Sequence, residues 1–275
     1  MKFDYASDLH LEFGGISELF FHPTESWRKN SESSVLILAG DIVEARMFCG
    51  KTAKAGLVHE AFEKLSNMYE HVFWVFGNHE YYGETLEYAI AHVRTKLDKL
   101  GLKNFHVLEN DTFVHGDVTF FGGTMWTSFH NGNPLEMMRF YNMNDSRYIK
   151  CYDANDRSWK REVNANEILS LHLKFTKKLH NFLSDTSGKK VVVTHHAPSA
   201  IVVADKWRGD PMNSCYVEEL GEVISYAQPN AWVFGHLHNH EYLPQSIGNT
   251  SILSNTRGYY GHDKVIGFQP KQYEV

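Results

Sequence analysis

Several apolar runs of this sequence end at residues whose side chains can bind metals or phosphates. The clearest is the run of residues 72–76, which is followed by Gly77, Asn78, His79 and Glu80. A run of this kind predicts a buried strand, and open α/β sheets bind their ligands beyond the carboxyl ends of their strands. Taken alone, the segment is equally compatible with a plain strand-to-helix turn, in which Gly77 and Asn78 only supply backbone freedom.

The same order of residues occurs earlier in the chain. Residues 2–6 predict a first strand, and Asp8 and His10 follow it with a spacing that directs both side chains to one side of an extended chain. The apolar run of residues 35–39 closes on a glycine and then Asp41. An isolated Asp-x-His pair is more often part of a surface turn, so the repetition carries more weight than any one pair.

Two later apolar runs end at histidines. Residues 191–194 lead into His195, and residues 231–234 lead through a glycine into His236 and His238. The chain has 17 histidines, and their bunching at these positions is poorly explained by surface solvation alone.

The predicted strand ends together offer carboxylate, amide and imidazole donors, and no thiolate. This set suits hard and borderline divalent metals. Two metals that lie about 3.5–4 Å apart need a shared anionic ligand to offset their repulsion. Asp41 is the natural bridge, because it stands between the donors that precede it and those that follow it.

Amphipathic helices are predicted between these strands, at residues 57–70 and 84–100, where apolar residues recur at helical spacing. Alternation of strands and helices favours parallel pairing in βαβ units. Residues 105–108, 112–114 and 118–121 form short strand-like runs without helices between them. These three runs predict antiparallel sheet.

The second half of the chain predicts further helices at residues 164–184 and 217–227. Residues 122–164 are rich in aromatic residues and methionine with little periodicity, which is typical of a lid, a binding loop or a small subdomain. An insertion that only covers the core is the alternative. We expect a single domain over residues 1–275, with an insertion or cap-like segment at about 122–164 that borders the active-site cleft and sets substrate choice.

The composition limits the class of protein. The 27 basic and 33 acidic residues give a net charge of −6, which does not favour a broad nucleic-acid footprint. The three cysteines form no CxxC pair and predict neither a disulfide framework nor a thiolate zinc site. No run approaches the roughly 18 apolar residues of a membrane span, and the first residues lack an apolar stretch of signal-peptide length. We expect a soluble, cytoplasmic protein with no membrane partner.

Together, the motifs resemble the signature of the calcineurin-like metallophosphoesterases. They are Asp8-x-His10, Gly40-Asp41, Gly77-Asn78-His79-Glu80, the strand-terminal His195 and Gly235-His236-x-His238. The resemblance spans residues 8–238 and implies an α/β fold, a four-layer αββα sandwich of mixed β-sheets flanked by helices, with two metals at the strand ends. The 122–164 segment lies outside the signature and inherits nothing from it.

The resemblance also implies a role for each residue. One metal is bound by Asp8, His10 and His238, the other by Asn78, His195 and His236, and Asp41 bridges both, while His79 stays free of metal. His195 is chosen over His196 because the first histidine after the strand is the ligand in the family. The metals are divalent or transition ions, with Mn, Fe, Zn and Ni all left open.

The implied activity is metal-dependent hydrolysis of a phosphomonoester or phosphodiester. A hydroxide that bridges the metals attacks phosphorus, and His79 protonates the departing oxygen, a role typically worth about 10²–10⁴-fold. Protein phosphatases of the family continue their Gly-Asp motif with Asp, Arg and Gly, whereas this chain has Ile42, Val43 and Glu44. A phosphoprotein substrate is therefore not expected. Glu44 could orient His79, but a solvated loop carboxylate is the favoured interpretation.

The expected substrate is a small phosphoester. Two alternatives remain: a nuclease that acts on DNA or RNA, which would need a basic track, and a non-catalytic scaffold of the same fold, against which the intact donors argue. Turnover of a chromogenic diester compared with single-stranded nucleic acid separates the first two. The sequence leaves the oligomeric state open.

Overall fold

The computed structural model of the chain describes residues 1–23, 26–30, 32–153, 156, 158–263 and 267–275. Two sheets form its centre. The first has the strand order β13-β1-β2-β3-β4, and the second has the order β11-β12-β10-β9-β6-β5. The strands of the first sheet are β1 (Lys2–Ala6), β2 (Val35–Ala39), β3 (His71–Val75), β4 (Phe105–Leu108) and β13 (Lys271–Glu274). Those of the second are β5 (Asp111–His115), β6 (Val118–Gly123), β9 (Lys189–Thr194), β10 (Ala231–Phe234), β11 (Gln245–Ile247) and β12 (Thr250–Ser254).

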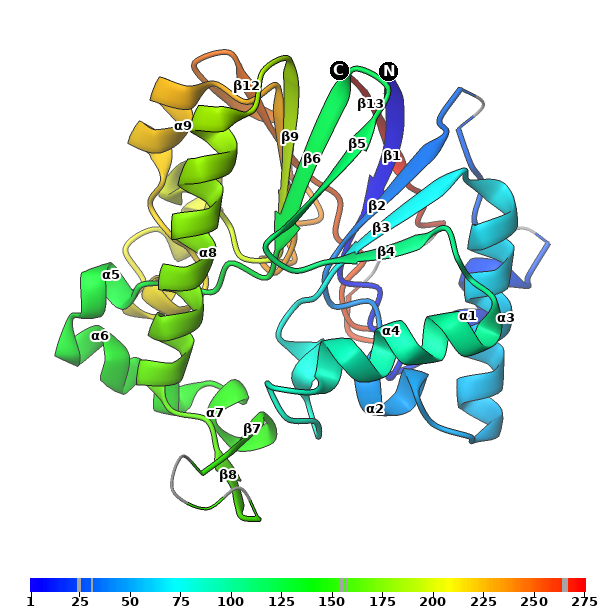
Figure 1. Cartoon of the computed structure of the whole chain (residues 1–275), viewed down its shortest axis with the longest axis horizontal. Coiled ribbons are helices and arrows are strands. Elements are labelled where there is room, and N and C mark those ends of the chain that lie inside the picture. Colours follow the sequence, from blue (N-terminus) through cyan, green and yellow to red (C-terminus); the bar gives the residue numbers. More distant parts are fainter. Residues whose placement is uncertain (24–25, 31, 154–155, 157, 264–266) are drawn as a thin grey trace.

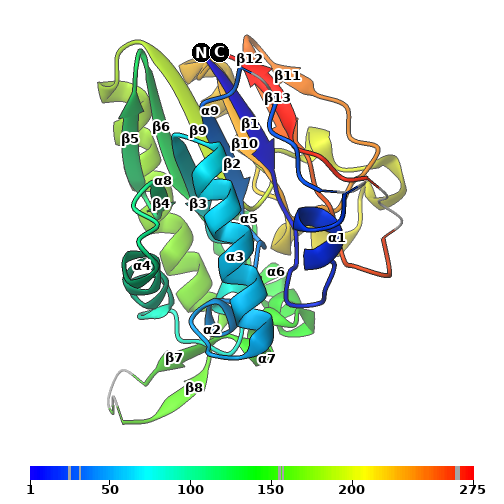
Figure 2. The ribbon, with the colours of Figure 1, turned by 90° about the vertical axis from the view of Figure 1, so that its right-hand side faces the viewer.

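Helices cover the outer face of each sheet (Figure 1, Figure 2). The longer ones are α3 (Ala53–Met68), α4 (Ala89–Leu100), α8 (Ala165–Asp185) and α9 (Gly221–Ala227). The short ones are α1 (Ile16–Phe20), α2 (Ala45–Phe48), α5 (Phe129–Gly132), α6 (Pro134–Arg139) and α7 (Asp145–Tyr148). The helices α3 and α4 lie beside the first sheet, and α8 and α9 lie beside the second. The expected four-layer αββα sandwich is confirmed.

The strand β2 shows why the layers form. Every residue of β2 is buried, as expected for a strand that is covered on both faces. Its side chains alternate, so that Val35, Ile37 and Ala39 pack between the two sheets. Leu36 and Leu38 point the other way, into the core beneath the helices. The continuous apolar run at 35–39 therefore fills two cores at once.

Most of the pairing is parallel, and this brings the strand ends together. In the first sheet β1, β2, β3 and β4 pair in parallel, and in the second sheet β6, β9, β10 and β12 do so. The carboxyl ends of these strands therefore meet at one end of the sandwich. The edge strands β5, β11 and β13 pair antiparallel.

One expectation about strand pairing was wrong, and one expected helix begins later in the chain. Residues 105–108 pair in parallel with β3, because α4 is the crossover that precedes them. Of the three runs expected to be antiparallel, the last two form the antiparallel β5–β6 hairpin. The helix expected from residue 84 begins at Ala89. Residues before it are held instead by tertiary pairing, because Tyr82 bridges to Ile149 and Thr85 bridges to Lys150.

The 122–164 segment consists of short pieces. Its described residues form the end of β6, the helices α5, α6 and α7, and a small hairpin of β7 (Lys150–Tyr152) and β8 (Lys160–Glu162). The segment ends where α8 begins, at a capping box in which the Asn164 side chain accepts from the backbone N–H of Glu167 and Glu167 accepts from that of Asn164.

Candidate metal centre

The predicted donors come together where the parallel strands of both sheets end. The loops after β1, β2 and β3 supply them from the first sheet, and the loops after β9 and β10 supply them from the second. Within each of three groups, the ligand atoms lie within 4.8 Å of one another, so each group could hold a metal ion. The groups are Asp8, His10 and His238; Asp41, His195 and His236; and His10, Glu12 and His79.

Asp41 lies between donors from the two sheets. Its Oδ2 atom lies 3.4 Å from Nε2 of His195 and 3.7 Å from Nε2 of His10. Its Oδ1 atom accepts the backbone N–H of His79 at 2.9 Å. The carboxylate is buried, so these neighbours rather than water determine its orientation.

Asn78 is held so that its amide oxygen faces the centre. Its Oδ1 atom lies 3.1 Å from Nε2 of His195. Its Nδ2 group donates to Oδ1 of Asp145 at 2.8 Å and to the Tyr82 hydroxyl at 3.2 Å. The Tyr82 hydroxyl in turn donates to Asp145 at 2.6 Å. A metal-competent amide is thus oriented by a buried carboxylate of α7, in the segment that the sequence motifs leave out.

The backbone at these strand ends is strained. Positive φ angles occur at Asp8 (54°), His10 (46°), Asp41 (54°), His236 (72°) and His238 (45°). Left-handed conformations of this kind cost non-glycine residues about 1–3 kcal/mol each, and they persist only where contacts with the surrounding structure hold them in place. Their concentration at the expected donors is typical of a functional site.

Glycines make room for the donors. A Cβ atom at Gly77 would lie 2.1 Å from Oδ1 of Asp41 and 2.7 Å from Nε2 of His195. At Gly40, where φ is 86°, a Cβ atom would lie 2.3 Å from Nδ1 of His195. Gly77 is therefore required by close approach, and not only by a turn.

The surroundings of His236 indicate whether these residues suit a metal ion. Among the described residues, Nε2 of His236 is buried and has no hydrogen-bond partner. Burial, reinforced by His196 and His195, holds the pKa of His236 well below its usual value, so the imidazole is neutral and its lone pair is available. A buried nitrogen without a hydrogen-bond partner destabilises the fold unless something binds it. Because it lies with Asp41 and His195, the donor set fits a metal ion.

The neighbouring histidines differ in direction. Nδ1 of His195 lies 3.0 Å from the Ala39 carbonyl oxygen, which leaves Nε2 facing Asp41 and Asn78. The His196 ring turns away, with Nδ1 at 3.2 Å from the Thr124 carbonyl oxygen. Burial, together with the charge of His195, lowers the pKa of His196 to about 3. His195 is thus the member of the pair that could serve as a ligand.

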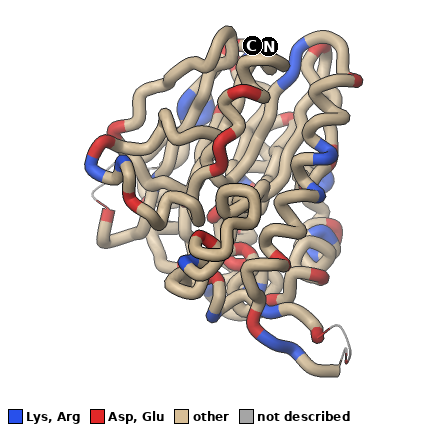
Figure 3. Tube along the Cα trace, turned by 90° about the vertical axis from the view of Figure 1, so that its left-hand side faces the viewer, with Lys and Arg blue, Asp and Glu red and all other residues tan. Residues whose placement is uncertain are grey.

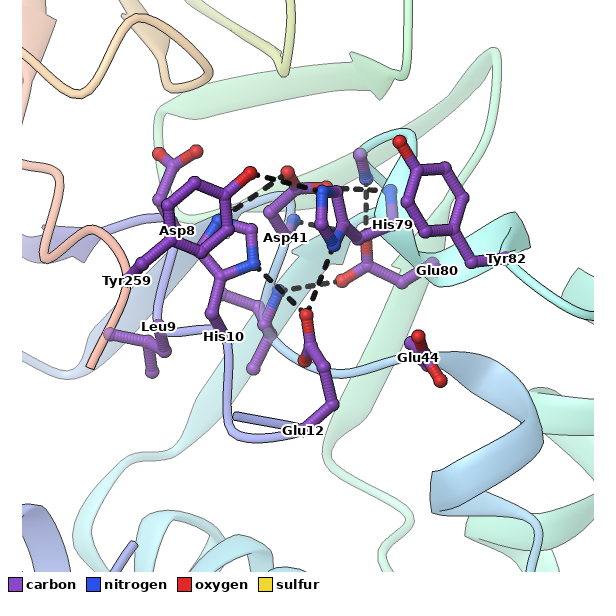
Figure 4. Close-up of polar contacts among 12 residues, drawn as sticks. Asp8, Leu9, His10, Glu12, Asp41, Glu44, His79, Glu80, Tyr82 and Tyr259 are labelled. Carbon is purple, nitrogen blue, oxygen red and sulfur yellow. Dashed lines mark hydrogen bonds and ion pairs between the residues drawn. The ribbon is translucent and has the colours of Figure 1, made fainter. Parts of the chain in front are cut away.

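His79 is held at both ring nitrogens (Figure 4). Its Nδ1 atom lies 3.1 Å from Oε1 of Glu12, and its Nε2 atom lies 3.3 Å from the Tyr259 hydroxyl. Its ring stacks on Tyr82 with the centroids 4.2 Å apart. Burial opposes its protonation, but the Asp41 and Glu12 carboxylates outweigh burial and raise the pKa of His79 to about 9. The geometry suits a cationic imidazole that keeps a proton.

Glu12 is the residue that the sequence reasoning missed. Its Oε1 atom also lies 3.0 Å from Nδ1 of His10, so one carboxylate oxygen contacts both imidazoles. Glu44 does not orient His79, because its carboxylate accepts from Nε of Arg46 at 2.6 Å and lies apart from the ring in Figure 4. The spacing of two between Asp8, His10 and Glu12 is no signal for this contact, because the backbone is left-handed at Asp8 and His10 and not extended.

The donors open onto a pocket of about 630 Å³. Asp41, Asn78, His79, His236 and His238 line it. Its other lining residues include Asn142, Met143, Asn144, Lys206, Trp207, Met212, Tyr216 and Tyr259. The 122–164 segment therefore borders the pocket through residues 142–144, as expected, although Trp126 and Arg139 do not line it.

The fold and these donors define a class of hydrolase, and comparisons with known proteins identify it. Residues 1–240 match the model of the calcineurin-like phosphoesterases, so the chain belongs to that family and is a hydrolase that acts on phosphoester bonds. None of the helices in the described part of the chain is long and apolar enough to cross a membrane.

Individual relatives are distant. An uncharacterized protein of Acanthamoeba polyphaga mimivirus, L509, is 26% identical over 98% of this chain and 94% of its own length. Phosphopantetheinyl hydrolase from Mycobacterium tuberculosis matches in structure with a TM-score of 0.64 and 14% identity, over 99% of this chain and 95% of that one. A dimetal phosphatase from Danio rerio gives a TM-score of 0.47 with 12% identity, over 93% and 87% of the two chains. At 14% identity the likeness to the mycobacterial hydrolase indicates the fold and leaves the substrate open.

Proposed function

We propose that this protein hydrolyses a small phosphoester at a centre of two metal ions, with His79 as the acid that protonates the leaving group. One observation carries the proposal. The Asp41 carboxylate lies between imidazoles of two donor groups, at 3.4 Å from His195 and 3.7 Å from His10. Beside it the buried Nε2 atom of His236 lacks a protein partner.

The proposed ligands divide into two sets that share Asp41. One ion would be held by Asp8, His10 and His238, and the other by Asn78, His195 and His236. The pair His238 and Asp8 supports the first set, since Nε2 of His238 lies 3.3 Å from Oδ1 of Asp8 and 3.1 Å from Nε2 of His10. When bound, the ions would supply Lewis acidity and a water activated for attack on phosphorus. Mn, Fe, Zn and Ni all remain candidates for them.

The role of His79 rests on where it is held. It faces the pocket, its Nδ1 atom is engaged by Glu12 and its Nε2 atom points to the Tyr259 hydroxyl. A proton on Nδ1 is therefore fixed by the carboxylate, which leaves Nε2–H as the proton to be donated to an alkoxide. Glu12 contacts Nδ1 of the ring and Tyr259 contacts Nε2, so the two residues hold opposite sides of the imidazole. The contact between Glu12 and His79 does not involve Asp41, so Glu12 would still favour protonation of His79 when cations offset the charge of Asp41.

The pocket supports a small substrate. Its volume of about 630 Å³ falls within the range of about 300–1,000 Å³ that is usual for small-ligand sites. Lys206 is the one Lys or Arg among the described residues that line it, and Trp207 and Tyr216 offer apolar surface. We propose that residues 142–144 and 206–207 select the alcohol part of the ester. A phosphopantetheinyl ester is worth including in a test, because the mycobacterial neighbour is named a phosphopantetheinyl hydrolase.

A nuclease is less well supported. Binding of a nucleic-acid backbone needs several cations along its path, whereas Lys and Arg are interspersed with Asp and Glu along the chain trace (Figure 3). Cytoplasmic location and a single domain over residues 1–275 remain part of the proposal.

The test is a panel of esters with metal-depleted and reloaded protein. We expect no turnover after chelation, and recovery with Mn²⁺ or another divalent ion on a nitrophenyl monoester or diester. Single-stranded DNA should be cut far more slowly than the best small ester. Faster cleavage of DNA would favour the nuclease, and no turnover of any ester with two ions bound would overturn the proposal.

A further inference from the structure

A second group of metal-competent side chains lies at the opposite end of the sandwich. Glu70 and His71 stand at the start of β3 in the first sheet, and His115 ends β5 in the second. One ligand atom of each lies within 4.8 Å of the others. The β5–β6 turn lies beside the chain termini in Figure 1, where the parallel strands begin, and none of the three residues lines the pocket.

Both nitrogens of His71 have neighbours that define their roles. Nδ1 lies 3.1 Å from Nε2 of His106, and Nε2 lies 3.8 Å from Oε1 of Glu70. The rings of His71 and His115 have centroids 5.0 Å apart at an interplanar angle of 77°. In the tautomer in which Nδ1 of His71 donates to His106, Nε2 carries the lone pair on the side of Glu70, and a histidine that donates through its other nitrogen is the usual form of a metal ligand.

The surroundings favour the neutral form of His71 and His106 and keep both rings in place. Burial, with the charge of His115, lowers the pKa of His71, and burial, with the charge of His71, lowers that of His106 to about 4. The Phe113 ring packs against His71 and His106 with centroid distances of 4.9 Å and 4.3 Å. Neutral, oriented imidazoles are the form that binds a metal, because the lone pair is free.

We propose that Glu70, His71 and His115 form a separate site for a first-row transition ion such as Zn²⁺. Two imidazoles and a carboxylate suit Zn²⁺, and a water completes a tetrahedron. Bonds of about 2.0–2.2 Å require the ligand atoms to draw closer together. The Glu70 side chain is 60% exposed and is free to turn inward. The bound ion would link β3 of one sheet to β5 of the other.

Metal content measures this site separately from the catalytic centre. Metal-depleted protein is titrated with Zn²⁺, desalted and analysed for zinc by mass spectrometry. His115→Gln should bind one zinc ion fewer than the wild type and keep full turnover when reloaded. Glu70→Gln, at an exposed position, should weaken binding of the same ion without affecting folding. In an Asp41→Asn background, which impairs the catalytic centre, the zinc that remains should disappear when His115→Gln is added.

A matched control is His92→Gln. His92 is exposed and lies 3.4 Å from Glu84, so it offers an imidazole–carboxylate pair without a second imidazole, and this variant should keep every zinc ion. Zinc at a hundredfold excess over its Kd should also raise Tm by about 5–10 °C through this site, an increment absent from His115→Gln. Equal zinc content and equal Tm shifts in wild type, His115→Gln and Glu70→Gln would overturn the proposal, as would an equal loss in His92→Gln.

Discussion

The loops that follow the strands and the 122–164 segment border the same pocket, but they contribute to it differently. The loops present metal-competent donors on strained backbone, as at Asp41 with φ of 54°. The segment presents residues 142–144 at the pocket wall, and behind Asn78 it places the buried carboxylate of Asp145. The donors therefore come from the strand ends, whereas the orientation of one donor depends on the segment.

The segment itself has two parts with different roles. Trp126 is buried, with its ring 5.7 Å from that of Tyr81 and 5.2 Å from that of His196, so this part covers the core as the packing alternative expects. Asp145 lies at the metal centre and hydrogen-bonds with Asn78 and Tyr82. The stretch around Trp126 thus packs against the core and residues 142–144 line the pocket, while a role of the segment in substrate choice stays a prediction.

The largest effect is expected at Asp41, in the loops. Asp41→Asn replaces the carboxylate with a neutral amide, which cannot offset two dications at one bridging point. Fewer ions should be bound at both catalytic positions. Turnover should fall by more than about 100-fold, the upper end of the loss that is typical when a residue behind the metal ligands is changed. Elemental analysis and an ester assay on the same sample measure both. Two catalytic ions retained with full turnover would show that Asp41 is not the bridge.

His79→Asn should keep both ions and lower turnover. The loss depends on the leaving group, because an alkyl alcohol needs a proton and a nitrophenolate does not. We expect about 10²–10⁴-fold with alkyl esters, or about 2.7–5.4 kcal/mol, and much less with nitrophenyl esters. The exposed His92→Asn serves as control. Equal losses with both esters would assign His79 to binding of the phosphoryl oxygens instead.

Asp145→Ala tests the contribution of the segment. Without the carboxylate, the Asn78 amide is free to turn its oxygen away, so metal affinity should fall by about 10–100-fold. Asp145→Asn should recover part of it, because an amide oxygen can still accept from Asn78. Tyr82→Phe leaves the 2.8 Å contact between Asn78 and Asp145 in place and should bind metal almost normally. If titrations give one affinity for all three variants, the segment does not orient the ligand.

Glu12→Gln should have the smallest effect, about 10-fold, and a particular pH dependence. Glu12 helps to raise the pKa of His79, so its loss should lower that pKa. Since a general acid works only while protonated, the alkaline limb of the pH–rate profile should move to lower pH. Glu44→Gln is the matched control, because Glu44 contacts Arg46 and not His79. If the pH–rate profile shifts equally in both variants, Glu12 does not position His79.

The sequence predicts the strand ends well because each is a local signal. A buried strand such as residues 35–39, a glycine and a polar donor are adjacent in the chain, and parallel pairing then brings these ends together. The choice of His195 over His196 agrees with the direction of the two rings.

The contacts of Asp145, Tyr259 and Glu12 were not predicted. Asp145 reaches Asn78 across 67 positions, and Tyr259 reaches His79 across 180, so no local pattern marks them. The parallel direction of residues 105–108 was missed for another reason: the three short runs were interpreted as one antiparallel group, although the helix before residue 105 supplies the crossover that a parallel pair needs.

The most direct test of the account is anomalous diffraction from crystals grown with Mn²⁺. We expect two peaks about 3.5–4 Å apart on either side of the Asp41 carboxylate. One should be bonded to Asp8, His10 and His238, and the other to Asn78, His195 and His236. His79 should lie outside bonding distance of both, with Nε2 facing the pocket. A single peak, or a peak bonded to His79 in place of Asn78, would contradict the account.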